Sequence, residues 1–426
     1  MIGESTVSSE DFMDNSIRVP IDLPDIRVLE LSKTEQGDWL IKVESTLQGT
    51  TCHKCGQEIT EVHCHDQPVR LRHLPLFEVP VYVEFCPKRY RCRYCQNHPT
   101  TTQRVTWHEP RSPNTKPYER WLLRILVNST VTDVARKLGV SEDIVNGAVE
   151  RWLSPEVEWE KFLELKVIGI DEISLKRGHR DFVAVISTPT TEGIEILAVL
   201  SDRKQQTVAN FLASIPDDLR QSIERVCSDM YQGFISAVRD ELPTARSVID
   251  RFHVAKSYCS CADAVRKREV KRLRQEMSKD EYEGIKGAMW AFRKRPENLQ
   301  DSEQQVLDRL LSYSPELKQA YDLREELTEI FERDYTKGGA KCAIHAWCKR
   351  VQNSGIKEFD CFLTTINNWL DEITNYFLEG WTSGFVEGFN NKIKVLKRRC
   401  YGIFDVKNLF RRISLDLNGY EKFAIP

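Results

Sequence analysis

Alternating hydrophobic and polar residues predict that the chain begins with β-strands. Residues 26–31 and 39–45 alternate on either side of a polar turn, a pattern typical of a β-hairpin. Alternating segments continue through residues 69–85 and end near His108. The stretch 109–117 contains several prolines and is interpreted as a linker. We therefore expect a β-rich N-terminal region that is separated from the rest of the chain.

The hydrophobic period changes to that of helices over residues 118–153. Within residues 130–152, a turn at Gly139 separates two short amphipathic segments, and this spacing is typical of a helix-turn-helix. The second segment has few side chains that could read bases, mainly Asn146 and Arg151. We therefore expect phosphate contacts to contribute much of its DNA binding. The alternative is an ordinary helical hairpin.

Strands and helices alternate again further along the chain. Three apolar, β-branched runs separated by short polar turns predict an antiparallel meander, and two later apolar runs with a helix between them predict a parallel βαβ unit. The meander covers residues 166–172, 181–188 and 193–201, and the βαβ unit covers residues 224–252. Residues 255–377 are helical in period throughout, and residues 383–399 form an amphipathic basic helix.

Composition agrees with a folded protein, because 41% of the residues are hydrophobic and 29% are charged. No apolar run approaches the roughly 20 residues of a membrane span. The first residues are polar and have no apolar signal core, so we expect a cytoplasmic protein. In a reducing compartment the thirteen cysteines are better interpreted as thiols and metal ligands than as disulfides.

Positive charge is unevenly distributed in a chain whose net charge is only −3. Lysine and arginine concentrate in residues 86–124, 264–275 and 389–412. Separate basic blocks in a nearly neutral chain indicate local surfaces for a polyanion such as DNA. For any single block, the alternative is a solvated helix face.

Two pairs of cysteines have the spacing of metal-binding knuckles. Cys52 and Cys55 form one CxxC pair, and Cys92 and Cys95 form the other. Each pair places two thiolates on a tight turn, as a tetrahedral Zn²⁺ site requires. The alternative is four unrelated free thiols, but two such pairs in one short region favour a structural zinc.

Three acidic residues accompany the predicted strands and the late helix. Asp171 is expected at the end of the strand VIGID, Asp229 at the end of RVCSD, and Glu387 on the helix at residues 383–399. Strand ends present side chains from a rigid backbone, and three carboxylates can hold two divalent ions for phosphoryl transfer. Each acid alone would be an ordinary surface carboxylate, so the joint pattern carries the prediction.

These motifs together resemble the DDE transposases of bacterial insertion sequences, in the group called ISL-three. The resemblance runs from Cys52 to Arg412 and includes the helix-turn-helix. The matching stretches are CHKCG, CRYC, GIDEISLKRG, CSDMYQGF, VIDRFHV and VEGFNNKIKVLKRRCYG. It implies a multidomain α/β fold whose RNase H-like catalytic core uses Asp171, Asp229 and Glu387 as ligands of Mg²⁺ or Mn²⁺.

The resemblance and the patterns together suggest how the chain is divided. We expect an N-terminal segment with a β-hairpin, a zinc-ribbon β domain, a helix-turn-helix domain, and an RNase H-like core that is interrupted by an all-helical insertion. The N-terminal segment covers residues 1–47, the zinc ribbon 48–108 and the helix-turn-helix domain 109–155. The two parts of the core cover residues 160–260 and 377–426, and the insertion between them covers residues 261–376.

Several residues near the acids are further candidates. The spacing of Asp250 and His253 resembles a signature that follows the second acid in such transposases, so both are expected to support the active site, with a structural Asp–His hydrogen bond as the alternative. Glu172 is expected to be structural. Trp290 and Trp347 could stack on a flipped base, although such residues are more often core. On the late helix, phosphate contacts are expected from Asn391, Lys392, Lys394, Lys397 and Arg398.

The sequence therefore predicts a transposase that binds the terminal inverted repeats of its element, cuts the ends and joins them to target DNA. Holding two ends together requires a homodimer on DNA. One alternative is a DNA-binding regulator derived from a transposase, and another is an RNase H-like nuclease or resolvase. A regulator would bind DNA without metal-dependent cleavage, whereas a transposase would cleave it. Inverted repeats on both sides of the gene would indicate a transposase and not a nuclease or resolvase.

Overall fold

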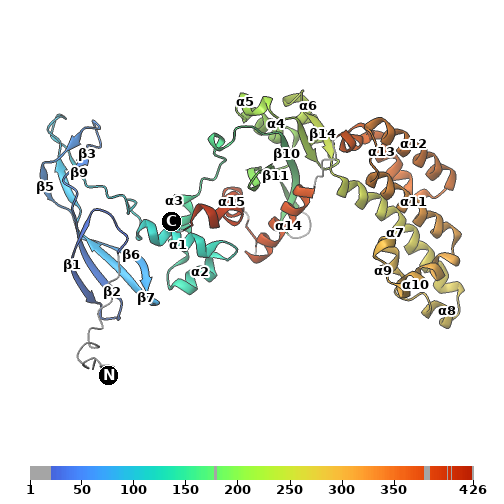
Figure 1. Ribbon diagram of the computed structural model, residues 1–426, viewed down its shortest axis with the longest axis horizontal. Helices are drawn as coiled ribbons and strands as arrows, with labels where there is room; N and C mark the ends of the chain where they lie inside the picture. The colour runs from blue at the N-terminus through green and yellow to red at the C-terminus, as the bar shows by residue number, and fades with distance from the viewer. Residues whose placement is uncertain (1–20, 177–179, 379–383, 401, 404, 425–426) are drawn as a thin grey trace, which may run out of the picture. The chain divides into compact units, whose positions relative to one another are not determined.

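The computed structural model describes residues 21–176, 180–378, 384–400, 402–403 and 405–424 (Figure 1). The chain forms two compact units. The first unit contains residues 1–151 and 419–426, and the second contains residues 152–418.

The predicted N-terminal hairpin forms, but it belongs to a larger sheet. Strands β1 and β2 pair with each other, and β2 also pairs in parallel with β7, giving the strand order β1-β2-β7-β6. The bounds are Ile26–Lys33 (β1), Trp39–Ser45 (β2), Val69–Leu76 (β6) and Val79–Phe85 (β7). One face of this sheet packs around buried Leu71, Val83 and Trp107. Segments 1–47 and 48–108, which we expected to be separate, thus share one hydrophobic core.

The remaining short strands form the ribbon that carries the cysteines. They make a two-stranded sheet, β3-β4, and a three-stranded sheet, β5-β8-β9. Their bounds are Thr50–Thr51 (β3), Glu58–Ile59 (β4), Val62–His65 (β5), Lys88–Arg91 (β8) and Thr100–Thr102 (β9). The ribbon is smaller than the sequence predicted, because β6 and β7 lie between the knuckles in sequence but join the other sheet.

Three helices follow, and they have the predicted helix-turn-helix pattern. These are α1 (Lys116–Leu126), α2 (Val131–Leu138) and α3 (Glu142–Trp152). Helix α2 ends at Gly139, whose φ of 61° lies in the left-handed region that favours glycine. Val145 and Ala148 of α3 are fully buried, so the inner face of the second helix is apolar.

The second unit contains a five-stranded mixed sheet with the order β12-β11-β10-β13-β14. Strands β10, β11 and β12 are antiparallel, whereas β13 and β14 run parallel to β10. The bounds are Val167–Lys176 (β10), Arg180–Thr190 (β11), Gly193–Val199 (β12), Arg225–Ser228 (β13) and Arg246–Ile249 (β14). The meander and the βαβ unit predicted from the sequence are both present, and together they form an RNase H-like sheet.

Helices cover both faces of this sheet (Figure 1). Helices α4 (Gln205–Ser214) and α6 (Gln232–Glu241) pack with Ile168 and Ile170 on one face, and a short α5 (Asp217–Gln221) adjoins them. Helices α14 (Gly384–Arg399) and α15 (Val406–Lys422) pack on the other face, against Ile173, Val183 and Val185. Because side chains alternate along a strand, Asp171 is on the α14 face and Glu172 is on the α4 face.

Between β14 and α14 the described residues form helices joined by short turns, with no strand, as predicted for the insertion. Its helices pack around a large apolar core that includes Phe292, Leu327, Trp347 and Phe362. Their bounds are Arg251–Glu276 (α7), Lys279–Glu283 (α8), Ala288–Arg293 (α9), Asp301–Ser312 (α10), Pro315–Glu332 (α11), Lys337–Ser354 (α12) and Asp360–Thr374 (α13).

Among the described residues, no helix combines the length and apolar character that crossing a membrane would require.

Candidate functional site

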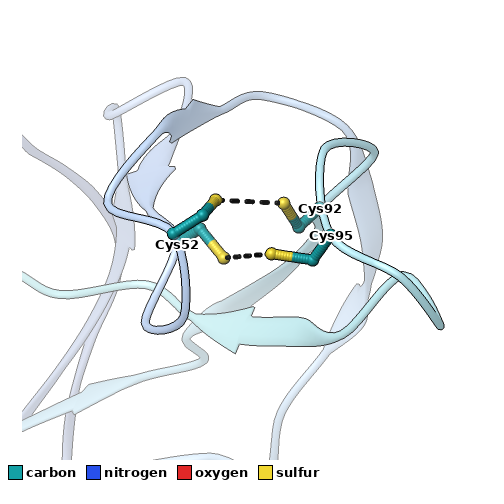
Figure 2. Close-up of side chains that lie close together, drawn as sticks. Cys52, Cys92 and Cys95 are labelled. Atoms are coloured by element: carbon teal, nitrogen blue, oxygen red, sulfur yellow. Dashed lines mark hydrogen bonds between the residues drawn. The ribbon is translucent and has the colours of Figure 1, made fainter.

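The four predicted zinc ligands come together in the ribbon (Figure 2). The sulfur atoms of Cys52 and Cys95 are 4.0 Å apart, and those of Cys55 and Cys92 are 3.7 Å apart. The first knuckle turns at Gly56, whose φ is 73° and whose N–H donates to the carbonyl of Cys52 at 3.0 Å. Sequence spacing alone thus located all four members of this cluster.

The geometry of the cluster fits a tetrahedral metal. A disulfide would bring two sulfurs to about 2.05 Å, whereas sulfurs 2.3 Å from a shared zinc ion would be about 3.8 Å apart. The two measured separations match the second value. Backbone hydrogen bonds from Cys55 and Lys54 lower the pKa of Cys52 to about 6. That thiol is therefore readily available as the thiolate that a metal requires.

A second cluster lies where the strands β10, β13 and β14 stop pairing with one another. The last pair between β10 and β13 is Ile170 with Ser228, and the last pair between β13 and β14 is Ser228 with Ile249. Asp171 and Asp229 therefore follow the same row of the sheet on adjacent strands, which lie about 4.8 Å apart. The register of two strands remote in sequence brings the two carboxylates together.

Asp171 does not end its strand, as the sequence suggested. Strand β10 continues to Lys176, because it pairs with β11 on its other side, where Asp171 lies opposite Val185. Its pairing with β13 ends one residue earlier, at Ile170. The carboxylate is therefore held by a continuous strand.

His253 completes this cluster. Ligand atoms of Asp171, Asp229 and His253 all lie within 4.8 Å of one another. The ring Nε2 of His253 is 2.8 Å from Oδ1 of Asp229, and the N–H of Glu172 donates to Oδ1 of Asp171 at 2.6 Å. The side chain of Asp229 is 17% exposed and that of His253 is 26% exposed, so the cluster opens to solvent on one side.

The electrostatics of the acidic cluster favour a cation. Burial, together with the negative charge of Asp229, raises the pKa of Asp171 to about 7. Burial alone would lower the pKa of His253, but its hydrogen bond to Asp229 and the surrounding carboxylates outweigh this and raise it. Two carboxylates this close repel each other unless a positive charge joins them. Oxygen donors with one imidazole suit Mg²⁺ or Mn²⁺.

Asp250 supports the cluster indirectly. It is the N-cap of α7, and its side chain accepts a hydrogen bond from the N–H of Phe252 at 2.9 Å. The ring of His253 contacts Asp229, whereas its backbone N–H donates to the carbonyl of Asp250 at 3.0 Å. An aspartate just before a helix is itself a capping signal, so the sequence contained this information. Asp250 therefore acts on the cluster by fixing the start of the helix that carries His253.

Glu387, the predicted third acid, is in α14, but its side chain lies outside the described residues. Further along that helix, Phe389, Ile393 and Leu396 are buried against the sheet.

Most of the predicted phosphate contacts on α14 are exposed. Lys394 is exposed, and its charge acts on Asp171 and lowers the pKa of that carboxyl against the larger effects that raise it. Asn391, Lys392 and Arg398 are also exposed. Lys397 differs, because its amine donates a hydrogen bond to the carbonyl of Ser174 on β10 and burial lowers the pKa of that amine. Lys397 therefore attaches α14 to the sheet.

Arg151 also has an internal partner where the sequence predicted a DNA contact. Its Nε is 3.1 Å from Oε1 of Glu119 on α1, and Nη2 contacts the same carboxylate. The side chain of Glu119 is fully buried, and that of Arg151 is 26% exposed. A guanidinium that neutralises a buried carboxylate is not available to read bases. Asn146, by contrast, is exposed on α3.

Of the two tryptophans considered for base stacking, one is buried and the other is exposed. Trp347 is fully buried, and its indole N–H donates to the carbonyl of Leu323 at 2.8 Å, so it belongs to the core. Trp290 is 63% exposed on α9. Glu172 pairs with Arg203 on the opposite face from Asp171, which confirms the structural role predicted for it.

The fold and the site first define a class. A mixed sheet of this order, with two aspartates and a histidine gathered where its parallel strands end, is the arrangement of an RNase H-like enzyme domain. Cysteine knuckles and a helix-turn-helix precede it, and both are common in proteins that bind DNA.

Comparison with known proteins gives the family. Residues 168–413 match the DDE transposases of family ISL3, and residues 103–153 match the helix-turn-helix domain of the same transposase family. The chain therefore belongs to the ISL3 family of DDE transposases.

Two known transposases align with most of the chain. The transposase for insertion sequence element IS1001 of Bordetella parapertussis is 27% identical over 382 residues, which cover 89% of this chain and 91% of that protein. The transposase for IS1557 of Mycobacterium tuberculosis is 24% identical over 392 residues, which cover 87% of this chain and 86% of that protein. A shorter alignment of 116 residues is with a protein of Lactococcus lactis described as an ATP-dependent protease. It is 32% identical and covers 27% of this chain and 35% of that protein.

Proposed function

We propose that this transposase binds the terminal inverted repeats of its own element and catalyses metal-dependent cleavage of the ends and their transfer to target DNA. The observation that carries the proposal is that ligand atoms of Asp171, Asp229 and His253 lie within 4.8 Å of one another. They meet where the parallel strands of the sheet stop pairing. Carboxylates held this close on a rigid sheet are what divalent-metal phosphoryl transfer requires.

In this proposal Asp171, Asp229 and Glu387 hold two Mg²⁺ or Mn²⁺ ions. When bound, these ions would activate the attacking hydroxyl and stabilise the leaving oxygen at the scissile phosphate. Helical spacing supports Glu387, because it precedes Lys394 by seven residues, a separation that would place both on one side of a helix. Lys394 is near enough for its charge to act on Asp171, and we propose that Glu387 shares this position.

The neighbouring residues have positioning roles. His253 holds the carboxylate of Asp229 through its 2.8 Å contact and leaves the second oxygen of Asp229 for a ligand. Asp250 fixes the first turn of α7, so it acts through His253 without touching the substrate. Lys394 would bind the phosphate next to the cut.

The proposed DNA contacts in each unit include the exposed candidates only. On α14 these are Asn391, Lys392, Lys394 and Arg398. On α3 Asn146 would contact a base or phosphate, and in the insertion Trp290 offers an exposed ring for stacking. We leave out Arg151 and Lys397, because both have partners inside the protein.

The remaining predicted features extend this proposal. Zn²⁺ is the metal proposed for the four cysteines, where it would stabilise the ribbon of short strands that precedes the helix-turn-helix. Two copies on DNA, one for each end of the element, would allow both ends to be cut together. Such work on chromosomal DNA would take place in the cytoplasm, at the nucleoid.

The test is to incubate the purified full-length protein with Mg²⁺ and a labelled duplex that carries the sequences flanking its gene. We expect metal-dependent cuts at the element ends. Glu387→Gln should keep end binding and lose cleavage, because a carboxamide is a much poorer ligand for a hard cation. Glu421→Gln, at an exposed position on α15, is the matched control and should cleave normally.

Other outcomes would support other functions. End binding by the unaltered protein without cleavage in any divalent metal would favour a regulator derived from a transposase. Cleavage without preference for the element ends would favour a nuclease or resolvase. Full activity of Glu387→Gln would remove Glu387 from the triad while leaving the family unaffected.

A further inference from the structure

A groove extends from the acidic cluster along helix α7. It has a volume of about 430 Å³ and begins at His253, the residue that contacts Asp229. Its α7 side includes Lys256, Ser257, Ser260 and Ala264, and Glu358 of the short helix η3 (Lys357–Phe359) faces it. Spacings of three, four and seven residues place these α7 side chains on one side of the helix.

The same side of α7 remains basic beyond the groove. Lys267 and Lys271 follow Ala264 at three and seven residues, and both are exposed. Lys256 and Lys271 form no ion pair with any residue that the structure describes, and Lys267 is 3.3 Å from Asp263. Lys267 and Lys271 belong to the basic block at residues 264–275. Neither the catalytic site nor the helix-turn-helix gives this block a function.

The acidic side chain in the groove is paired inside the protein. Oε1 of Glu358 is 2.8 Å from Nε of Arg268, and the same guanidinium also contacts Glu316. Arg268 therefore offsets the charge of Glu358 in part. In the row of lysines, Lys256 and Lys271 are the two without an ion pair in the part of the chain that the structure describes.

We propose that this row of residues, from Lys256 to Lys271, binds the sugar–phosphate backbone of the DNA that leads away from the cleaved bond. The inference rests on the proposed function, because it needs a DNA substrate in the acidic cluster. Small hydroxyl side chains and lysines are typical contacts to phosphate oxygens. The described residues that line the groove include no tryptophan, tyrosine or phenylalanine, which base stacking would require.

The length of the row agrees with a duplex. From His253 to Lys271 an α-helix rises about 27 Å, at 1.5 Å per residue. At 3.4 Å per base pair this corresponds to about eight base pairs of DNA. The insertion would therefore hold the DNA next to the cut on the same helix that carries His253, so that a single rigid element would set both positions.

The first test measures binding of the labelled end duplex against salt concentration. The double variant Lys256→Ala/Lys271→Ala removes two cations from the row, and Lys349→Ala removes an exposed lysine from α12 as the matched control. Each lost phosphate contact lowers the salt slope by about 0.9. We therefore expect the double variant to have a slope shallower by about two and an affinity about tenfold weaker, with the control unchanged.

The second test locates the contact. A photoreactive amino acid at Ser260 should crosslink to nucleotides within about eight base pairs of the cut, whereas the same group at Lys349 should not. If the unaltered protein binds and cleaves the duplex but the double variant keeps its affinity and slope, the inference is wrong and the proposed function stands. Equal crosslinking from both positions would also overturn it. If the unaltered protein neither binds nor cleaves the end duplex, the proposed function fails and the inference fails with it.

Discussion

Replacement of Arg151 tests whether this residue stabilises the helix-turn-helix or contacts DNA. Its guanidinium contacts both carboxylate oxygens of Glu119, with Nε at 3.1 Å and 3.3 Å. Glu119 also accepts hydrogen bonds from Ser112 at 2.7 Å and from Asn114 at 3.3 Å. In Arg151→Ala these two neutral donors would remain, but the buried carboxylate would lose its counter-charge.

The expected cost follows from the burial of the pair. Removing one partner of a buried ion pair typically costs about 3–5 kcal/mol. Because the side chain of Arg151 is 26% exposed and two other donors remain on Glu119, we expect the lower end, about 3 kcal/mol. That free energy corresponds to about a 150-fold increase in the population of the locally unfolded state.

Hydrogen exchange measured on the full-length protein can detect this change in one region. Amides in α1, α2 and α3 should lose about 150-fold in protection in Arg151→Ala, while amides in the sheet of the second unit should not change. Arg136→Ala, at an exposed arginine on α2, is the matched control and should change protection little. The double variant Glu119→Leu/Arg151→Leu removes both charges and should regain most of the stability.

Two results would refute this reasoning. If Arg151→Ala behaves like Arg136→Ala in hydrogen exchange, the buried pair does not stabilise these helices. If its protection is unchanged but end binding is lost, Arg151 contacts DNA as the sequence first suggested.

Three further predictions concern the metals and the DNA surface. The purified protein should contain about one Zn²⁺ per chain, and Cys92→Ser should lose it while Cys64→Ser, outside the cluster, should not; full zinc in Cys92→Ser would contradict the site. Because burial raises the pKa of Asp171 to about 7, above the roughly 3.9 of an unfolded chain, its contribution to the stability of the metal-free protein is present at low pH and is lost as pH rises through 7. Protons then compete with the cation, so the increase in Tm on adding Mn²⁺ should be larger at pH 8 than at pH 6, and equal increases would refute this. Lys394→Ala should weaken end binding by about 1 kcal/mol with a shallower salt slope, whereas Lys397→Ala should leave the slope unchanged.

Features that depend on a local pattern of residues could be predicted from the sequence. Hydrophobic period predicted the strands of the catalytic sheet and the helical insertion, because burial on one face imposes a repeat that can be read directly. CxxC spacing predicted the four-cysteine cluster, since each pair needs only one tight turn to bring its sulfurs together. Turn residues predicted the helix-turn-helix, in which Gly139 adopts the left-handed conformation.

Only the tertiary structure decided what depends on residues far apart in sequence. The register of β10 against β13 placed Asp171 beside Asp229, and no local pattern specifies that register. Arg151 and Lys397 looked like DNA contacts because an unpaired cation in a sequence appears free, yet each has a partner inside the protein that only packing reveals. Local periodicity follows from neighbouring residues, whereas the partner of a charge follows from the arrangement of the whole chain.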